Sequence, residues 1–198
     1  MMKLGLAFRH GCCLTLLAAV GWRGLSGTLL AQATNAPKTI LEAFEAQTGV
    51  VIVEGSMPMG SVSAEAGMVS VRCKESKDAT TGHKESGLAI EVRAGEVQTD
   101  ATIVDYDELD SFLNAIDYVS KADYRVTTLP LFDVYYTTKG GLTIATYSSK
   151  RSPGSIHAAL QSNHIIKTRV ILTPQQLAQF QALIQQSKAK LDSLRTVK

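Results

Sequence analysis

Three histidines of the predicted mature chain are the residues best suited to acid–base or metal chemistry, because an imidazole changes its charge close to neutral pH. His83 lies in a polar segment, residues 75–86, which has no apolar periodicity and is predicted to be an exposed, mobile loop. His157 and His164 fall on two adjacent predicted strands of one hairpin. Each position is a candidate for chemistry only if other reactive groups converge on it.

The predicted hairpin keeps the second and third histidines apart. A two-residue turn at Ser162-Asn163 would place Gln161 opposite His164, and His157 opposite Thr168. We therefore expect no metal ion to be shared between the two imidazoles.

The chain carries none of the common catalytic motifs. It has no H-E-x-x-H, no G-x-S-x-G, no P-loop and no G-x-G-x-x-G. Ser152 and Ser155 lie near His157, but spacing alone does not make a serine a nucleophile, and we interpret both as structural polar residues. We predict a protein that is not an enzyme, with no catalytic, metal-binding or cofactor-binding residues and no cofactor. The alternative is a small secreted hydrolase with a loop site near His83 or His157.

A cluster of acids precedes a predicted helix and could in principle bind a hard cation. The segment lacks the glycine and the distal glutamate of a calcium-binding loop. Carboxylates in a first helical turn are stabilised by the helix dipole. We therefore predict a capping role for these acids, with Asp105 or Asp107 as the cap; the cluster comprises Asp105, Asp107, Glu108 and Asp110.

Cys73 would be the single cysteine of the mature chain, which excludes an intramolecular disulfide there. It shares one alternating face with Val69 and Val71, so we expect a small buried hydrophobic residue. The alternatives are a reactive thiol or a bridge to another chain.

The first thirty-three residues have the order of a secretory signal peptide. Lys3 and Arg9 precede an apolar run, residues 12–20, and the segment ends in Ala31-Gln32-Ala33. The apolar run is too short to span a membrane. We predict cleavage near Ala33, a secreted or periplasmic protein, and no transmembrane segment in the mature chain.

Removal of that segment changes the charge of the protein. The full chain has 20 basic and 18 acidic residues, and losing Lys3, Arg9 and Arg23 leaves 17 basic residues, a net charge of −1. This balance argues against a nucleic-acid partner. The basic run Ser148–Ser152 is interpreted as a solvated turn, with contact to an anionic partner as the alternative.

Elements of the first half follow from caps, turns and periodicity. Thr39 and Glu42 form a capping box that starts a helix, and Gly49 suits its C-terminal end. Residues 54–66 are predicted to be a loop because they contain Pro58 and two methionines. A hairpin turn is expected at Ala94-Gly95-Glu96. The predicted strands cover residues 50–53, 68–74, 88–93 and 97–104, and an amphipathic helix follows over 107–121.

The second half has the same order of elements. Lys139-Gly140-Gly141 indicates a tight hairpin, and Thr173-Pro174 marks the start of a final helix over 174–194. The predicted strands cover 133–138, 142–147, 155–161 and 164–172. An offset of 68 residues aligns Phe112 with Phe180, so both phenylalanines are expected to be buried against a sheet.

These elements predict an α+β fold with antiparallel sheets, built from two similar halves of about four strands and one amphipathic helix, after a short N-terminal helix. We expect one compact domain over residues 34–198, with a duplication over about 39–122 and 123–198. The layout resembles some single-stranded nucleic-acid-binding folds, although the charge argues against that function. The segment 41–53 resembles the helix–glycine–strand opening of small periplasmic secretin and TonB-linked domains, from which no functional residue is carried over.

The sequence thus predicts an exported binding or structural module of the cell envelope or extracellular space. Its partner would be another protein or an envelope component.

Overall fold

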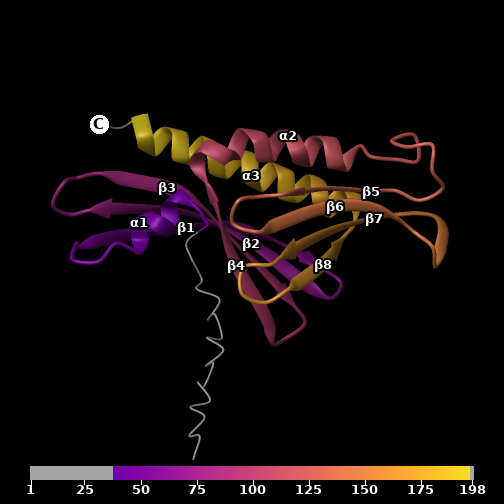
Figure 1. Ribbon diagram of the computed structural model, residues 1–198, viewed down its shortest axis with the longest axis horizontal. Coiled ribbons are helices and arrows are strands. Elements are labelled where there is room, and N and C mark those ends of the chain that lie inside the picture. The colour runs from indigo at the N-terminus through magenta and orange to yellow at the C-terminus, as the bar shows by residue number, and fades with distance from the viewer. Residues whose placement is uncertain (1–37, 197–198) are drawn as a thin grey trace, which may run out of the picture. The chain divides into compact units, whose positions relative to one another are not determined.

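The computed structural model describes residues 38–196, which form two antiparallel four-stranded sheets and three α-helices. Sheet A has the strand order β1-β2-β3-β4, and sheet B has the order β5-β6-β7-β8 (Figure 1). The predicted α+β fold with two similar halves is confirmed. The elements are α1 (Ile40–Glu45), β1 (Ile52–Ala64), β2 (Gly67–Asp78), β3 (Lys84–Ala94), β4 (Gln98–Asp105), a 3-10 turn η1 (Tyr106–Glu108), α2 (Leu109–Ser120), β5 (Asp133–Thr137), β6 (Leu142–Ser149), β7 (Ser152–Ser162), β8 (Thr168–Leu172) and α3 (Pro174–Thr196).

Each half places its helix on the sheet of the other half. The helix α2, which ends the first half, packs on β5 and β6, whereas α3, which ends the second half, packs on β1 and β2. The two helices also pack against each other, side by side in Figure 1. This exchange means that the inner face of each sheet is covered by a helix from the other half.

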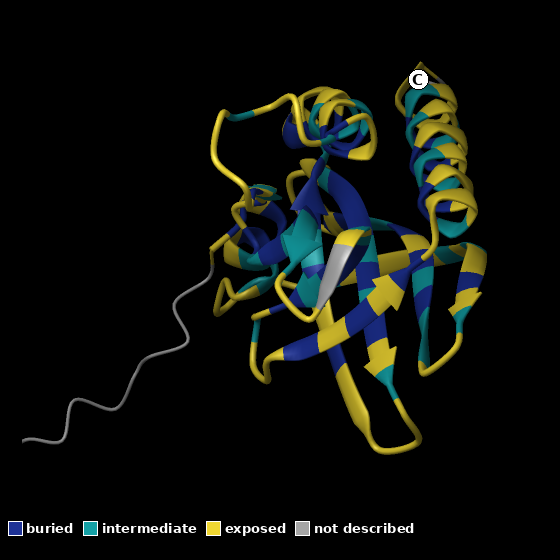
Figure 2. Ribbon diagram, turned by 90° about the vertical axis from the view of Figure 1, so that its right-hand side faces the viewer, coloured by how far each residue is buried: buried dark blue, intermediate teal, exposed yellow. Residues whose placement is uncertain are grey.

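The core lies between the two helices and the inner faces of the sheets. Buried and exposed residues alternate along many of the strands, as Figure 2 shows. Phe112 on α2 and Phe180 on α3 are both 0% exposed, and their ring centroids are 6.2 Å apart in an edge-to-face arrangement. The predicted burial of both phenylalanines is therefore confirmed.

The segment 54–66 is part of a long strand and not a loop, so that prediction is wrong. β1 pairs with β2 from Ile52 to Ala64, with an irregularity between Pro58 and Gly60. β1 is an edge strand, where a proline without an N–H is tolerated. Gly60 has a φ of 148°, and the break in register lets the strand continue past both residues.

The predicted loop over residues 75–86 is shorter than expected. β2 continues to Asp78 and β3 begins at Lys84, which leaves five residues for the turn. The carboxylate of Asp78 closes this turn by accepting hydrogen bonds from the backbone of Thr80 and Thr81, at 2.7 and 3.2 Å.

The hairpin between β7 and β8 also differs from its prediction. Ser162 pairs with Thr168, and Gln161 pairs with Arg169, so the connection spans residues 163–167 and contains His164. The expected pairings of Gln161 with His164 and of His157 with Thr168 are both wrong, because the backbone after Ser162 is bound by β4 of the other sheet.

The offset of 68 residues noted in the sequence maps β3 onto β7 from end to end. Within residues 38–196, no helix is long and apolar enough to cross a membrane. The segment 1–33, on which the prediction of export rests, lies outside the described residues.

Candidate functional site

The acids of β4 and the turn after it bind the backbone of other elements. Asp100, Asp105 and Glu108 are 4%, 2% and 6% exposed, respectively. Asp105 accepts hydrogen bonds from the N–H groups of Ile40 and Leu41 at the start of α1, at 2.8 and 3.1 Å. These N–H groups have no partner within the helix, so the carboxylate acts as a cap supplied from a distant strand.

The expectation that Asp105 or Asp107 caps the following helix is therefore wrong. Neither Asp105, at the N-cap of η1, nor Glu108, at the N-cap of α2, makes a side-chain capping bond. Glu108 accepts hydrogen bonds from the backbone of Lys139 at 3.0 Å and from the hydroxyl of Tyr136 at 3.2 Å. Burial, together with this carboxylate, raises the pKa of Tyr136. Asp107 pairs with the ammonium of Lys139 at 3.1 Å.

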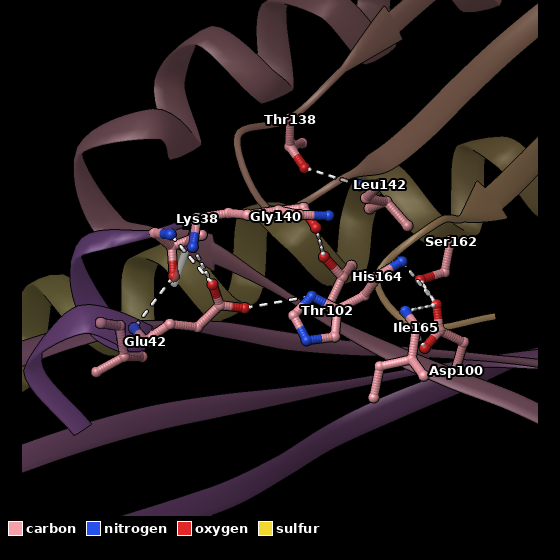
Figure 3. A network of polar contacts seen from close by, with 12 residues as sticks. Lys38, Glu42, Asp100, Thr102, Thr138, Gly140, Leu142, Ser162, His164 and Ile165 are labelled. Atoms are coloured by element: carbon pink, nitrogen blue, oxygen red, sulfur yellow. Dashed lines mark hydrogen bonds and ion pairs between the residues drawn. The ribbon is translucent and has the colours of Figure 1, made fainter. Parts of the chain in front are cut away.

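Asp100 holds the connection between β7 and β8 (Figure 3). Its carboxylate accepts hydrogen bonds from the hydroxyl of Ser162 at 2.5 Å and from the N–H groups of His164 and Ile165 at 2.9 and 3.2 Å. Two residues along β4, the hydroxyl of Thr102 donates to the carbonyl of Gly140 in the β5–β6 turn at 2.8 Å. β4 is thus an edge strand of sheet A that is tied to two turns of sheet B.

His164 lies at this junction, between α1 and β4. Its Nδ1 atom is buried, makes no hydrogen bond and lies 3.4 Å from Oε1 of Glu42 (Figure 3). Glu42 also completes the predicted capping box with Thr39, which is confirmed. The junction brings a histidine, two carboxylates and a serine together, which the sequence did not predict. Ser162 is 0% exposed, however, so its hydroxyl cannot meet a substrate.

Among the described residues, no group of three or more histidines, cysteines, aspartates or glutamates is arranged to hold a metal ion. His83 is 62% exposed, with Nε2 3.1 Å from a carboxylate oxygen of Glu85. Its ring packs edge-to-face on Phe44 with a centroid distance of 5.5 Å.

Cys73 is 3% exposed, which confirms its predicted burial. Its thiol lies 3.5 Å from the carbonyl oxygen of Ser187 on α3, to which it donates. Burial raises the pKa of the Cys73 thiol, and a protonated thiol is a weak nucleophile.

The outer face of sheet B forms a second candidate site. Tyr147 and His157 are partners across β6 and β7, and their rings stack with centroids 5.6 Å apart. The guanidinium of Arg169, on β8, lies over the same tyrosine ring at 4.8 Å from its centroid. Ala159 lies between His157 and Gln161 on the same face of β7 and is 3% exposed. Small and large side chains therefore alternate along this face.

Two surface hollows adjoin this stack. The first, of about 240 Å³, is lined by Asp133, Tyr135 and Gln161 together with Tyr147 and Arg169. The other, of about 510 Å³, lies between His157, Arg169 and the β1–β2 turn.

The side chains of this face are available to a ligand. Tyr135 is 66% and Ile171 47% exposed, so both side chains are open to solvent. Tyr135 and Tyr136 lie on opposite faces of β5, as neighbours on a strand do, and Tyr136 stacks on Phe112 with a centroid distance of 6.2 Å. We call the face formed by Tyr135, Tyr147, His157, Gln161 and Arg169 the tyrosine–arginine face.

Comparison of the chain with protein-family models, with curated proteins and with solved structures finds no match.

Proposed function

We propose that the protein is an exported, non-enzymatic binding module of the cell envelope or extracellular space, and that the tyrosine–arginine face binds an acidic partner. The observation that carries this proposal is the stack of His157, Tyr147 and Arg169 on an open sheet face. Aromatic rings supply contact area at a small cost in conformational entropy. The planar guanidinium of Arg169 can donate two parallel N–H hydrogen bonds to one carboxylate.

The charge of the face supports an acidic partner. Arg169 makes no ion pair with any residue of the described range, although it lies beside the hollow that contains Asp133. Its planar group is held over Tyr147, so little side-chain freedom is lost when a carboxylate binds. Export, which the order of residues 1–33 predicts, would bring this face into contact with acidic polymers of the envelope.

The surroundings of the histidines support a non-enzymatic role over the alternative of a hydrolase near His83 or His157. The His83 ring contacts a glutamate and a phenylalanine, and the His157 ring contacts a tyrosine. General base catalysis requires a nucleophile or its proton within hydrogen-bond distance of the base. Among the side chains that the structure describes, which do not include those of Ser152 and Pro153, neither ring is hydrogen-bonded to a serine, threonine or cysteine.

Binding of defined polymers tests the proposal. The purified protein is titrated with polygalacturonate, poly-L-glutamate and neutral dextran, and we expect one or both acidic polymers to bind while dextran does not. Arg169→Gln should weaken binding about tenfold, the worth of one charge-assisted contact. Arg93→Gln is the matched control, because Arg93 is an exposed arginine on β3 of the other sheet. Equal behaviour of the two variants, or no binding of either acidic polymer, would overturn the proposal.

A further inference from the structure

A third hollow, of about 480 Å³, lies between residues 55–57 of β1, residues 73–75 of β2 and the last turns of α3. Its volume is within the range of small-molecule sites. We call it the α3 cavity. Its lining combines apolar side chains with amines. The apolar side chains are those of Met57, Cys73, Leu191 and Leu194, and the amines are those of Lys74, Lys84 and Lys190.

The apolar lining comes from the inner face of sheet A and from α3. Met57 and Cys73 are partners across β1 and β2, so both side chains point to the same side of the sheet. Leu191 is 1% exposed and Leu194 is 40% exposed, which means that the apolar lining runs from the core out to the surface. A hollow of this kind fits a hydrocarbon chain that enters from solvent.

The three lysines differ in their ion pairs. Lys74 pairs with Glu45 at 2.7 Å, and Lys84 pairs with Glu75 at 3.0 Å. Lys190 forms no ion pair with any described residue, although it is only partly exposed. It also lies close enough to Cys73 to oppose the rise in the pKa of the thiol that burial causes. An unpaired ammonium next to a buried apolar surface is suited to an anion that carries an apolar tail.

The guanidinium of Arg195 lies 3.4 Å from the hydroxyl of Ser86 on β3 and 4.1 Å from the ring centroid of Tyr106, outside the lining of the cavity. Glu75 is the single acid among the described residues that line the cavity, and Lys84 pairs with it. The unpaired ammonium of Lys190 is therefore the lining charge that favours an anion over a cation.

We infer that the α3 cavity binds a single-chain amphiphilic carboxylate, such as a free fatty acid, with its tail against Met57, Cys73 and Leu191 and its carboxylate at Lys190. This site is separate from the tyrosine–arginine face, which lies on the other sheet. Each CH₂ group that leaves water strengthens binding, so affinity should rise with chain length until the cavity is filled.

Calorimetric titration of the purified protein tests this site with three probes at concentrations below micelle formation. Dodecanoate has both tail and carboxylate, butyrate has the carboxylate with a short tail, and dodecyltrimethylammonium has the tail with the opposite charge. We expect dodecanoate to bind at one site and the other two to bind at least about tenfold more weakly. Equal binding of dodecanoate and the cationic amphiphile would overturn the inference.

Two lysine variants locate the carboxylate. Lys190→Gln should weaken dodecanoate binding about tenfold. Lys188→Gln, two residues earlier on α3, is the matched control because its ammonium pairs with Asp110 and Asp192 instead. An equal loss for both variants would mean that dodecanoate does not bind at Lys190.

A further variant locates the tail. Leu194→Asp places a carboxylate in the lining at a residue that is 40% exposed, so the fold should survive while dodecanoate binding is lost. Unchanged binding by Leu194→Asp would contradict the assigned position.

Discussion

The carboxylate of Asp100 accepts a hydrogen bond of 2.5 Å from the hydroxyl of Ser162, and this contact joins β4 of sheet A to the end of β7 in sheet B. Both residues are buried. The same carboxylate fixes the backbone that follows Ser162, so one side chain determines where β7 ends and how the next connection begins.

Asp100→Ala should destabilise the protein by about 3 kcal/mol, because it leaves a buried hydroxyl and backbone N–H groups without their acceptor. Urea unfolding measures the change. Asp110→Ala is the control: that side chain is 79% exposed, and its loss should change the free energy of unfolding by less than about 0.5 kcal/mol. Similar values for the two variants would show that the Asp100 contacts do not hold the sheets together.

The two central phenylalanines should each matter for stability. Phe112→Ala and Phe180→Ala should each cost about 3–5 kcal/mol, since both rings are fully buried. Their edge-to-face contact at 6.2 Å predicts that the double variant departs from additivity by about 0.5–1.5 kcal/mol. Losses below about 1 kcal/mol for both single variants would contradict the burial of the two rings in the core.

Gly140 should not tolerate a side chain. A Cβ atom there would lie 2.1 Å from the backbone oxygen of Ile103, so the β5–β6 turn would have to move away from β4. We expect Gly140→Ala to destabilise the protein by about 1–3 kcal/mol in thermal or urea unfolding. Gly55→Ala is the matched control, because its nearest neighbour would be 3.9 Å away. A neutral result at Gly140 would refute the close approach of the two sheets.

The contact between Tyr106 and Asp192 should appear in the pH dependence of stability. The tyrosine hydroxyl donates to the carboxylate at 2.6 Å and lowers the pKa of Asp192 below 3.8. The stabilisation is therefore fully present above about pH 4 and is lost as the pH falls through the pKa of the folded state. Tyr106→Phe should remove this part of the acid-induced loss, so the stability curves of the two proteins should converge at low pH. Parallel curves down to the acid limit would contradict the assignment.

Elements decided by a few neighbouring residues could be predicted from the sequence. The capping box of Thr39 and Glu42 and the turn at Gly140-Gly141 depend on contacts within about four residues, and both were found where expected. Thr173 caps α3, which begins at Pro174 as predicted: its hydroxyl accepts from the backbone of Gln176.

Features decided by distant residues could not be predicted in this way. β1 passes through Pro58 and Gly60 because β2 supplies its pairing partner, which local propensity does not reveal. His164 lies in a connection because Asp100, far away in the sequence, binds its backbone. The tyrosine–arginine face could not be predicted from the sequence either, because Tyr147 and Arg169 contact each other only when β6, β7 and β8 are in register.

Nuclear magnetic resonance mapping of the acidic-polymer complex tests the central claim most directly. Addition of polygalacturonate or poly-L-glutamate to labelled protein should shift the signals of Tyr135, Tyr147, His157 and Arg169, because these side chains form the proposed binding face. The signals of exposed residues on sheet A, such as Arg93, should remain in place. Shifts confined to sheet A, or no shifts with either polymer at saturating concentration, would contradict the account.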